Sequence, residues 1–277
     1  MNQAVNRKAG QVFAAVLLAL SVIIGGCSDN GTGSRSANGR MVLMMHDAPV
    51  NDLKQVWLTV ESVTLIRSGT QIGDGTGPIV LSQPIRADFL AVGSVALVLA
   101  AAEVAEGTYS KIRLQVSDPE FVLKNDSVVT ASEIQLVADG HVDLNFQGGF
   151  EIGSDSTAVL SLDLNLEKSI EVNATGNGRF ILRPQIFVDS VSSEAKEAIV
   201  LGATVVARDS SSRQLELQPP GSQTSMTVTM SNQTQLIGIG GLPIVLGTIS
   251  VGSRLDAAGR LDFRTGVFTA SRIQLRT

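Results

Sequence analysis

Two segments of the chain repeat one pattern of acidic and amide side chains at alternate positions. The members are His141, Asp143 and Asn145 in the first segment and Asp163, Asn165 and Glu167 in the second. Side chains two apart on a β-strand share one face, so each trio would line one face of its strand. If the two strands pair, oxygen ligands of the kind that calcium prefers would converge. The pattern therefore suggests the hypothesis that these six residues form a Ca²⁺ site.

The same spacing is also typical of amphipathic strands whose polar faces point to water, as antiparallel sheets commonly show. No glycine-bearing calcium loop of the EF-hand type accompanies the carboxylates. We therefore expect two solvated strand faces and no cofactor, with calcium kept as the alternative.

His46 is followed directly by Asp47. A histidine beside an aspartate suggests that the histidine could act as a general base. Neighbouring strand residues point to opposite faces, so these two side chains are not expected to meet. Asp47 precedes Ala48 and Pro49 and is expected to cap a turn. The chain has two histidines and no G-x-S-x-G motif. We predict that the protein is not an enzyme, and consider a hydrolase only if a cleft gathers a histidine with two carboxylates.

Two arginines, Arg113 and Arg183, stand among apolar residues of expected strands. An arginine in such a place usually pairs with a carboxylate, and Asp163 or Asp47 could serve. We predict a structural ion pair here, with a ligand-binding role as the alternative.

The single cysteine, Cys27, follows a basic start and an apolar run. Arg7 and Lys8 precede the apolar residues 12–24, and two glycines stand directly before the cysteine. This order is typical of a secretory signal peptide. It resembles a bacterial lipoprotein signal, which implies a signal peptide over residues 1–26, cleavage after Gly26 and lipidation of Cys27. The alternative is an N-terminal helix that is retained and still anchors the protein.

The location follows from this anchor. One acyl chain alone holds a protein only marginally on a membrane, but a lipoprotein cysteine carries a diacylglyceryl group and usually an N-acyl chain as well. Residues 91–102 are the most apolar later stretch, and they are shorter than the roughly 20 residues that a spanning helix needs. We expect the protein to be located in the cell envelope. Ser28 after the cysteine implies the outer membrane if the cell is Gram-negative.

Composition excludes several classes of site. The formal net charge is −5, without the basic stripe that nucleic acid requires. Because Cys27 is the only cysteine, the folded part has no disulfide, zinc–thiolate site or cysteine nucleophile. Trp57 and Tyr109 are the only tryptophan and tyrosine, and both lie in expected strands with apolar neighbours. We expect both in the core rather than on a platform for sugars.

The elements that position these residues are mostly strands. Residues 27–39 are rich in glycine, serine and asparagine and are expected to be a flexible tether. From Met41 onward the apolar period is two, interrupted by frequent turn signals. The expected strands are residues 56–65, 109–116, 141–146, 159–166 and 179–188, and the alanine-rich residues 91–105 fit a helix or a strand. Residues 40–191 are therefore predicted to form a β-sandwich.

A second series of strands follows a change of pattern at residues 192–196. Its members are residues 198–208, 214–218, 225–230, 252–257 and 266–275. Residues 197–277 have the size of a small closed barrel. The sequence therefore predicts an all-β chain, an antiparallel β-sandwich followed by a small β-barrel-like domain.

Several motifs of the first domain occur in a familiar order. They are residues 44–50, 107–114, 162–170 and 180–184. Together they resemble the domain-of-unknown-function family forty-three eighty-two, found in bacterial surface lipoproteins, over residues 40–191. The C-terminal part of the chain resembles the uncharacterised family fifty-six sixty-six. The residues that carry this resemblance are Gly202, residues 252–255, Gly259 and residues 268–275. These resemblances imply architecture and location and no activity.

These observations together predict a lipid-anchored envelope protein that serves as a non-enzymatic ligand-binding or assembly module. Exposed loops on a rigid sandwich are the usual place for such sites. The alternative is a structural protein that packs against other envelope proteins through edge strands. The expected partners are the membrane, through the N-terminal lipid, and an envelope protein or a glycan.

Overall fold

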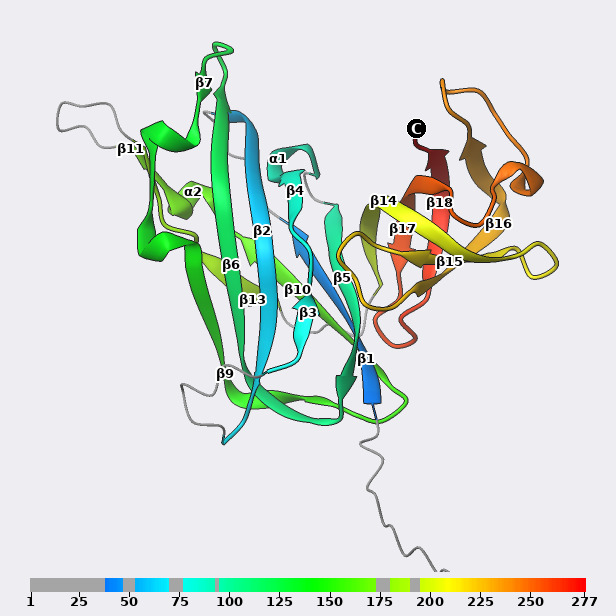
Figure 1. Cartoon of the computed structure of the whole chain (residues 1–277), viewed down its shortest axis with the longest axis horizontal. Helices are drawn as coiled ribbons and strands as arrows, with labels where there is room; N and C mark the ends of the chain where they lie inside the picture. The colour runs from blue at the N-terminus through cyan, green and yellow to red at the C-terminus, as the bar shows by residue number, and fades with distance from the viewer. Residues whose placement is uncertain (1–37, 47–52, 70–76, 93–94, 173–179, 190–194) are drawn as a thin grey trace, which may run out of the picture. The chain divides into compact units, whose positions relative to one another are not determined.

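The fold is almost entirely β, with 66% strand and 8% helix. The computed structural model describes residues 38–46, 53–69, 77–92, 95–172, 180–189 and 195–277, and all structural statements refer to these (Figure 1). The all-β prediction is confirmed. In this part of the chain, no helix is both long and apolar enough to cross a membrane. Cys27, the tether and Asp47 lie outside the described residues.

One sheet of the sandwich is built on two long antiparallel strands, β2 and β6, which cross the whole layer (Figure 1). The shorter strands pair along their two sides. The strands are β2 (Leu53–Arg67), β3 (Ile79–Leu81), β4 (Ile85–Asp88), β6 (Gly107–Leu123), β7 (Val128–Val129) and β9 (His141–Ile152).

The facing layer is part of a nine-stranded sheet and is mixed rather than purely antiparallel. Its sandwich strands, in spatial order, are β13 (Ile186–Asp189), β10 (Thr157–Leu164), β1 (Asn38–His46) and β5 (Ala96–Ala105). The parallel pair is β1 with β10, which brings Val42 opposite Val159. Beyond β5 the sheet continues into the second series of strands, because Ala96 pairs with Ala198.

Smaller elements complete the sandwich. A three-stranded sheet consists of β8 (Ile134–Leu136), β12 (Phe180–Leu182) and β11 (Ile170–Val172). Two short helices are α1 (Phe89–Val92) and α2 (Leu166–Ser169), and 3₁₀ turns span Ala131–Glu133 and Val137–Gly140. The single strand expected over residues 179–188 is wrong. It is divided at Arg183 and Pro184, because proline lacks the amide that a sheet ladder needs.

The strands β1 and β5 are buried on both faces. Met41, Leu43 and Met45 pack into the sandwich core, whereas Val42 and Met44 pack with the second series of strands. At the start of β5, Leu97 and Leu99 pack into the sandwich core, whereas Ala96 and Val98 pack with the second series of strands. A strand covered on both sides reads as a continuous apolar run without a polar period. This burial explains why residues 91–105 fitted a helix or a strand from sequence alone; residues 96–105 form a strand.

The second series of strands closes into a five-stranded barrel. The ring runs in the order β14, β15, β16, β18, β17 and back to β14. Its strands are β14 (Lys196–Asp209), β15 (Gln214–Gln218), β16 (Met226–Ile237), β17 (Arg254–Leu261) and β18 (Phe268–Leu275), with a 3₁₀ turn, η3, at Leu246–Thr248. A side chain at Gly259 would place its Cβ 2.1 Å from the Thr269 carbonyl oxygen, so glycine is required for β17 to approach β18.

Candidate functional site

The first predicted trio lies on one face of β9, as expected. His141, Asp143 and Asn145 are all exposed, and the residues between them are more buried. The Asp143 carboxylate is already occupied by neighbours on β6. Arg113 Nε lies 2.7 Å from Oδ1 and Nη2 lies 2.9 Å from Oδ2, and Lys111 Nζ lies 3.1 Å from Oδ2. Two cations therefore neutralise this carboxylate.

The second trio does not share a strand. β10 ends at Leu164, and the Asn165 side chain instead accepts a hydrogen bond from the Lys168 amide at 2.9 Å, which caps α2. Glu167 lies within that helix. Asp163 alone remains on β10.

The condition for a joint calcium site is not met, since β9 pairs with β6 whereas β10 pairs with β1 and β13. The six residues are therefore not brought together. Across the described ranges, no group of three or more acidic, histidine or cysteine side chains is placed to hold a metal ion. The repeated pattern reflects two separate local roles, an ion cluster on β9 and a helix cap after β10.

Arg113 does form an ion pair, but the predicted partner is wrong. Its carboxylate is Asp143, directly opposite it in the β6–β9 register, and not Asp163. Asp47, the other predicted partner, lies outside the described residues. The Arg183 side chain is exposed.

The Arg113 guanidinium lowers the pKa of Asp143 from 3.8 to about 2. A depressed carboxyl pKa contributes stability that is present above the unfolded-state pKa and is lost as the pH falls through the folded-state value. We therefore expect wild-type stability to fall between pH 4 and pH 2 more steeply than that of Asp143→Asn. Urea unfolding at stepped pH measures this difference.

The matched control is Asp126→Asn, which removes an exposed pair with Lys54. Because the side chain of Asp143 is 34% exposed, the effect at neutral pH should stay within about 1 kcal/mol. Parallel stability curves for wild type and Asp143→Asn would contradict the assignment.

His46 meets a carboxylate across strands rather than along its own. Its Nδ1 lies 3.7 Å from Asp163 Oδ1, and the two residues are register partners on β1 and β10. The second histidine, His141, lies on β9 with Nδ1 3.2 Å from the Ala138 carbonyl oxygen. The two histidines therefore belong to different sheets. The absence of enzymatic activity stays a prediction.

The single tyrosine and the single tryptophan lie in different environments. Tyr109 is fully buried and its hydroxyl donates to the Ala105 carbonyl at 2.7 Å, so its expected core role is confirmed. Trp57 is only half-buried, and the Arg86 guanidinium lies 5.8 Å from its ring centroid. Arg86 also pairs with Glu120 at 3.2 Å. The expected core role of Trp57 is therefore wrong, since it stacks beneath a surface cation.

Five-stranded Greek-key barrels often bind ligands over their second and third strands, here β15 and β16. The half-buried side chains that alternate with the core there include Glu216, Thr227 and Thr229. Glu216 accepts hydrogen bonds from the Ser225 and Thr227 hydroxyls at 3.0 and 2.7 Å. These strands contain no aromatic residue on which a base could stack. This face therefore lacks a stacking platform, and the absence of a nucleic-acid partner stays a prediction.

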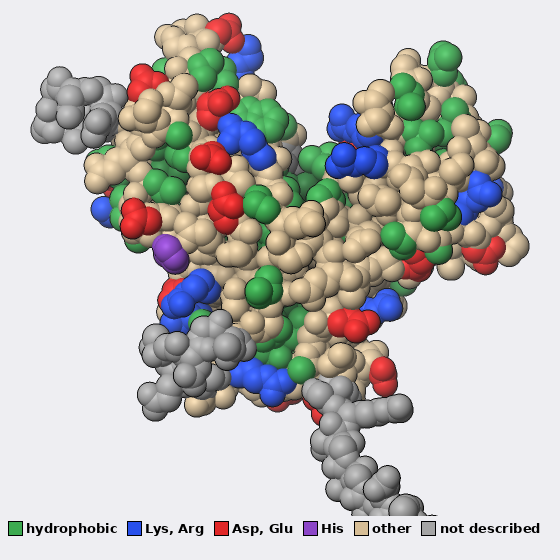
Figure 2. Space-filling view, in the orientation of Figure 1, with side chains coloured by type: hydrophobic (Ala, Val, Ile, Leu, Met, Phe, Trp, Pro, Cys, Tyr) green, Lys and Arg blue, Asp and Glu red, His purple; other side chains and the backbone are tan. Residues whose placement is uncertain are grey.

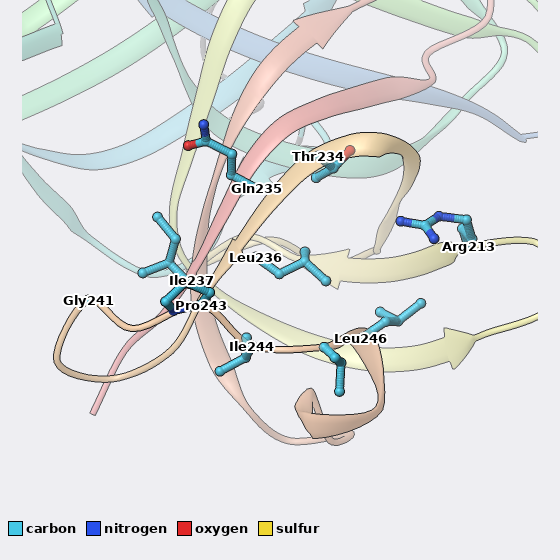
Figure 3. Close-up of a pocket in the computed structure, with 10 residues that line it drawn as sticks. Arg213, Thr234, Gln235, Leu236, Ile237, Gly241, Pro243, Ile244 and Leu246 are labelled. Carbon is cyan, nitrogen blue, oxygen red and sulfur yellow. The ribbon is translucent and has the colours of Figure 1, made fainter.

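A hollow of about 570 Å³ opens elsewhere on the barrel, beside the connection from β16 to β17 (Figure 3). We call it the barrel groove. Its apolar wall is formed by Leu236, Ile237, Pro243, Ile244, Val245 and Leu246. Thr234, Gln235 and Arg213 supply its polar atoms. Small-molecule sites are typically such apolar hollows with a few placed polar groups.

Arg213 provides the charge of the barrel groove (Figure 3). It follows β14 in a tight turn with φ of 53°, and its Nη2 donates to the Ser231 carbonyl at 2.8 Å. The Nε atom is buried and has no hydrogen-bond partner among the described residues. A buried donor without an acceptor is costly, so this nitrogen is suited to an anionic oxygen from outside.

Sequence reasoning did not find the barrel groove. The groove residues 234–246 fall between the expected strands 225–230 and 252–257, where no element was predicted. The available signal was the uncharged apolar run from Leu236 to Val251, which is longer than a turn requires. The role of Arg213 depends on the turn that brings it to β16 and could not be inferred from spacing.

Comparison with known proteins gives one match. Residues 38–184 match a protein-family model described as "Domain of unknown function (DUF4382)". The match starts with β1 and ends just after β12, so it covers most of the sandwich and excludes the barrel. No curated protein and no solved structure matches the chain.

Proposed function

The chain belongs to the DUF4382 family of domains of unknown function, and from this premise we propose that it is a lipid-anchored, non-enzymatic binding module of the cell envelope. Residues 1–26 serve as the signal peptide and Cys27 carries the lipid. Ser28 directs the protein to the outer membrane where the cell is Gram-negative. The likeness of the tail to family fifty-six sixty-six is part of the same proposal and adds no activity.

The barrel groove supports the binding role. It combines an apolar wall with one cation whose Nε lacks an acceptor. An apolar wall contributes affinity through burial, and a charge-assisted hydrogen bond fixes the orientation of the ligand. The ligand class that satisfies both is an amphiphilic anion, an apolar body with one acidic group. No covalent step is required of any residue.

The probe 8-anilinonaphthalene-1-sulfonate has this chemistry and tests the site. We expect saturable fluorescence enhancement with the native protein, and about tenfold weaker binding to Arg213→Gln, because a hydrogen bond to a charged group contributes about 1.5–3 kcal/mol. Fluorescence titration measures both dissociation constants.

The matched control is Arg272→Gln, an exposed arginine on β18 that does not line the barrel groove. Equal affinities for wild type, Arg213→Gln and Arg272→Gln would reject the barrel groove as the site. Weaker binding to both variants would indicate a general effect of surface charge.

A structural role is the second candidate and is favoured by one observation. β13 is the terminal strand of the nine-stranded sheet, and its Phe187 is 46% exposed. An edge strand with an exposed aromatic side chain can receive a strand from another protein. A stoichiometric partner captured from solubilised envelope by wild type, and lost with Phe187→Ser, would favour this role.

A further inference from the structure

The connection from β16 to β17 has two faces of different character. Ile249 is fully buried, and Ile244 and Leu246 pack against the barrel core, so the inner face closes one end of the barrel. The exposed part of the connection carries four large aliphatic side chains. They are Ile239, Leu242, Val245 and Val251, with exposed fractions of 60%, 71%, 71% and 64%.

We call these four residues the barrel crest. Figure 2 shows hydrophobic side chains gathered on the barrel in this region. Exposed apolar residues scattered singly need no explanation, but a concentration of them marks an interaction surface. From Leu236 to Ser253 the chain contains no charged residue and no histidine, so no ionised side chain of this segment opposes transfer into an apolar medium.

Part of the backbone of the connection is hydrogen-bonded within the connection itself. The Gly238 amide donates to the Leu242 carbonyl at 2.7 Å, and the Gly241 amide donates back to the Gly238 carbonyl at 3.1 Å. The Thr248 amide donates to the Val245 carbonyl at 2.9 Å. In addition, Arg208 Nη1 donates to the Gly247 carbonyl at 2.9 Å and also to the Ile249 carbonyl. These bonds satisfy backbone groups that would be costly to leave unpaired in lipid.

We propose that the barrel crest inserts into the surface of a phospholipid bilayer. A protein partner is the weaker alternative, because protein interfaces are dominated by aromatic and arginine side chains and by hydrogen bonds. The segment from Leu236 to Ser253 has no aromatic residue and no arginine. A bilayer requires only apolar area, which four aliphatic side chains supply.

The proposed anchor makes this contact local, and this step rests on the proposed function. Ten residues lie between Cys27 and Asn38, where β1 begins, and the eleven Cα–Cα steps that join these two residues span at most about 40 Å when fully extended. A lipid at Cys27 would therefore hold the barrel crest at high effective concentration beside the membrane. A weak insertion would then suffice to orient the protein.

Site-specific fluorescence tests the insertion in the full lipidated chain. The protein is reconstituted in phosphatidylcholine vesicles that contain a doxyl-labelled lipid, and a nitrobenzoxadiazole probe is attached at Leu242→Cys. We expect the probe to shift to the blue and to lose most of its emission to the doxyl quencher. The matched control is Val128→Cys on β7, a position of 53% exposure, where emission should stay unquenched.

A second measurement ties the result to the barrel crest. With the probe at Val251→Cys, the added pair Ile239→Ser and Leu242→Ser should remove most of the quenching. These positions are exposed, so the substitutions should leave folding intact. Equal quenching at Leu242→Cys and Val128→Cys, or none at either, would overturn the proposal. A blue shift in native envelope but not in lipid vesicles would also overturn it and indicate a protein partner.

The same experiment tests separately whether Cys27 is lipidated. A lipidated Cys27 takes up no thiol probe, so labelling of the unsubstituted chain would reject the anchor. In that case the vesicles are added to the unanchored chain, and the comparison between Leu242→Cys and Val128→Cys still decides on the barrel crest.

Discussion

If Cys27 is lipidated as we propose, the substitution Cys27→Ser is expected to abolish the lipidated form and to release the protein from the membrane of the cell envelope. A hydroxyl cannot form the thioether that carries the diacylglyceryl group. Each methylene buried in the bilayer contributes about 0.8 kcal/mol, so the loss of two or three acyl chains removes essentially all of the anchoring energy. Mass spectrometry of the N-terminus and density-gradient fractionation of the envelope measure the two effects.

The neighbouring variant Ser28→Ala is the control, since it keeps the sulfur and the small residues before it. It should remain lipidated and membrane-bound. A wild-type polypeptide found free in solution, or an unchanged distribution of Cys27→Ser, would reject the anchor.

The largest loss of folding stability is expected from Phe121→Ala. Phe121 is fully buried in the sandwich core, where its ring meets Phe180 edge-to-face at a centroid distance of 5.9 Å. Removing a buried phenyl ring leaves a cavity, and such substitutions cost about 3–5 kcal/mol. The midpoint of urea unfolding measures the change.

The same substitution at Phe187 is the matched control, because this ring is 46% exposed. Phe187→Ala should change stability by only about 0.5 kcal/mol, the range usual for surface positions. Similar losses at both positions would mean that Phe121 is not part of the principal core.

Local pattern predicted most of the strands of eight or more residues, and few of the shorter ones. The expected strand over residues 214–218 is β15, and the one over residues 56–65 lies within β2. These segments have one buried face, so their apolar period of two is visible in the sequence. Residues 159–166 were extended too far, because Asn165 ends β10 by capping α2. A side-chain cap competes with the strand in a way that periodicity does not show.

Strand pairing was beyond the reach of the same reasoning, and the candidate site depended on it. The calcium alternative for Asp143 required β9 to pair with β10, whereas the neighbour of β9 is β6. His46 was compared with the residue beside it in sequence, whereas Asp163 lies opposite it from a strand far along the chain. Periodicity fixes which face a residue occupies but not which strand lies next to it.

The position of β1 between β5 and β10 has a consequence for the kinetics of folding. Val42 pairs with Ala101 on one side and with Val159 on the other. This layer therefore cannot form until more than half of the polypeptide has been synthesised. Such non-local topologies have a high contact order and fold slowly. If the chain is exported as we propose, this delay would keep it unfolded while it passes through a narrow translocon.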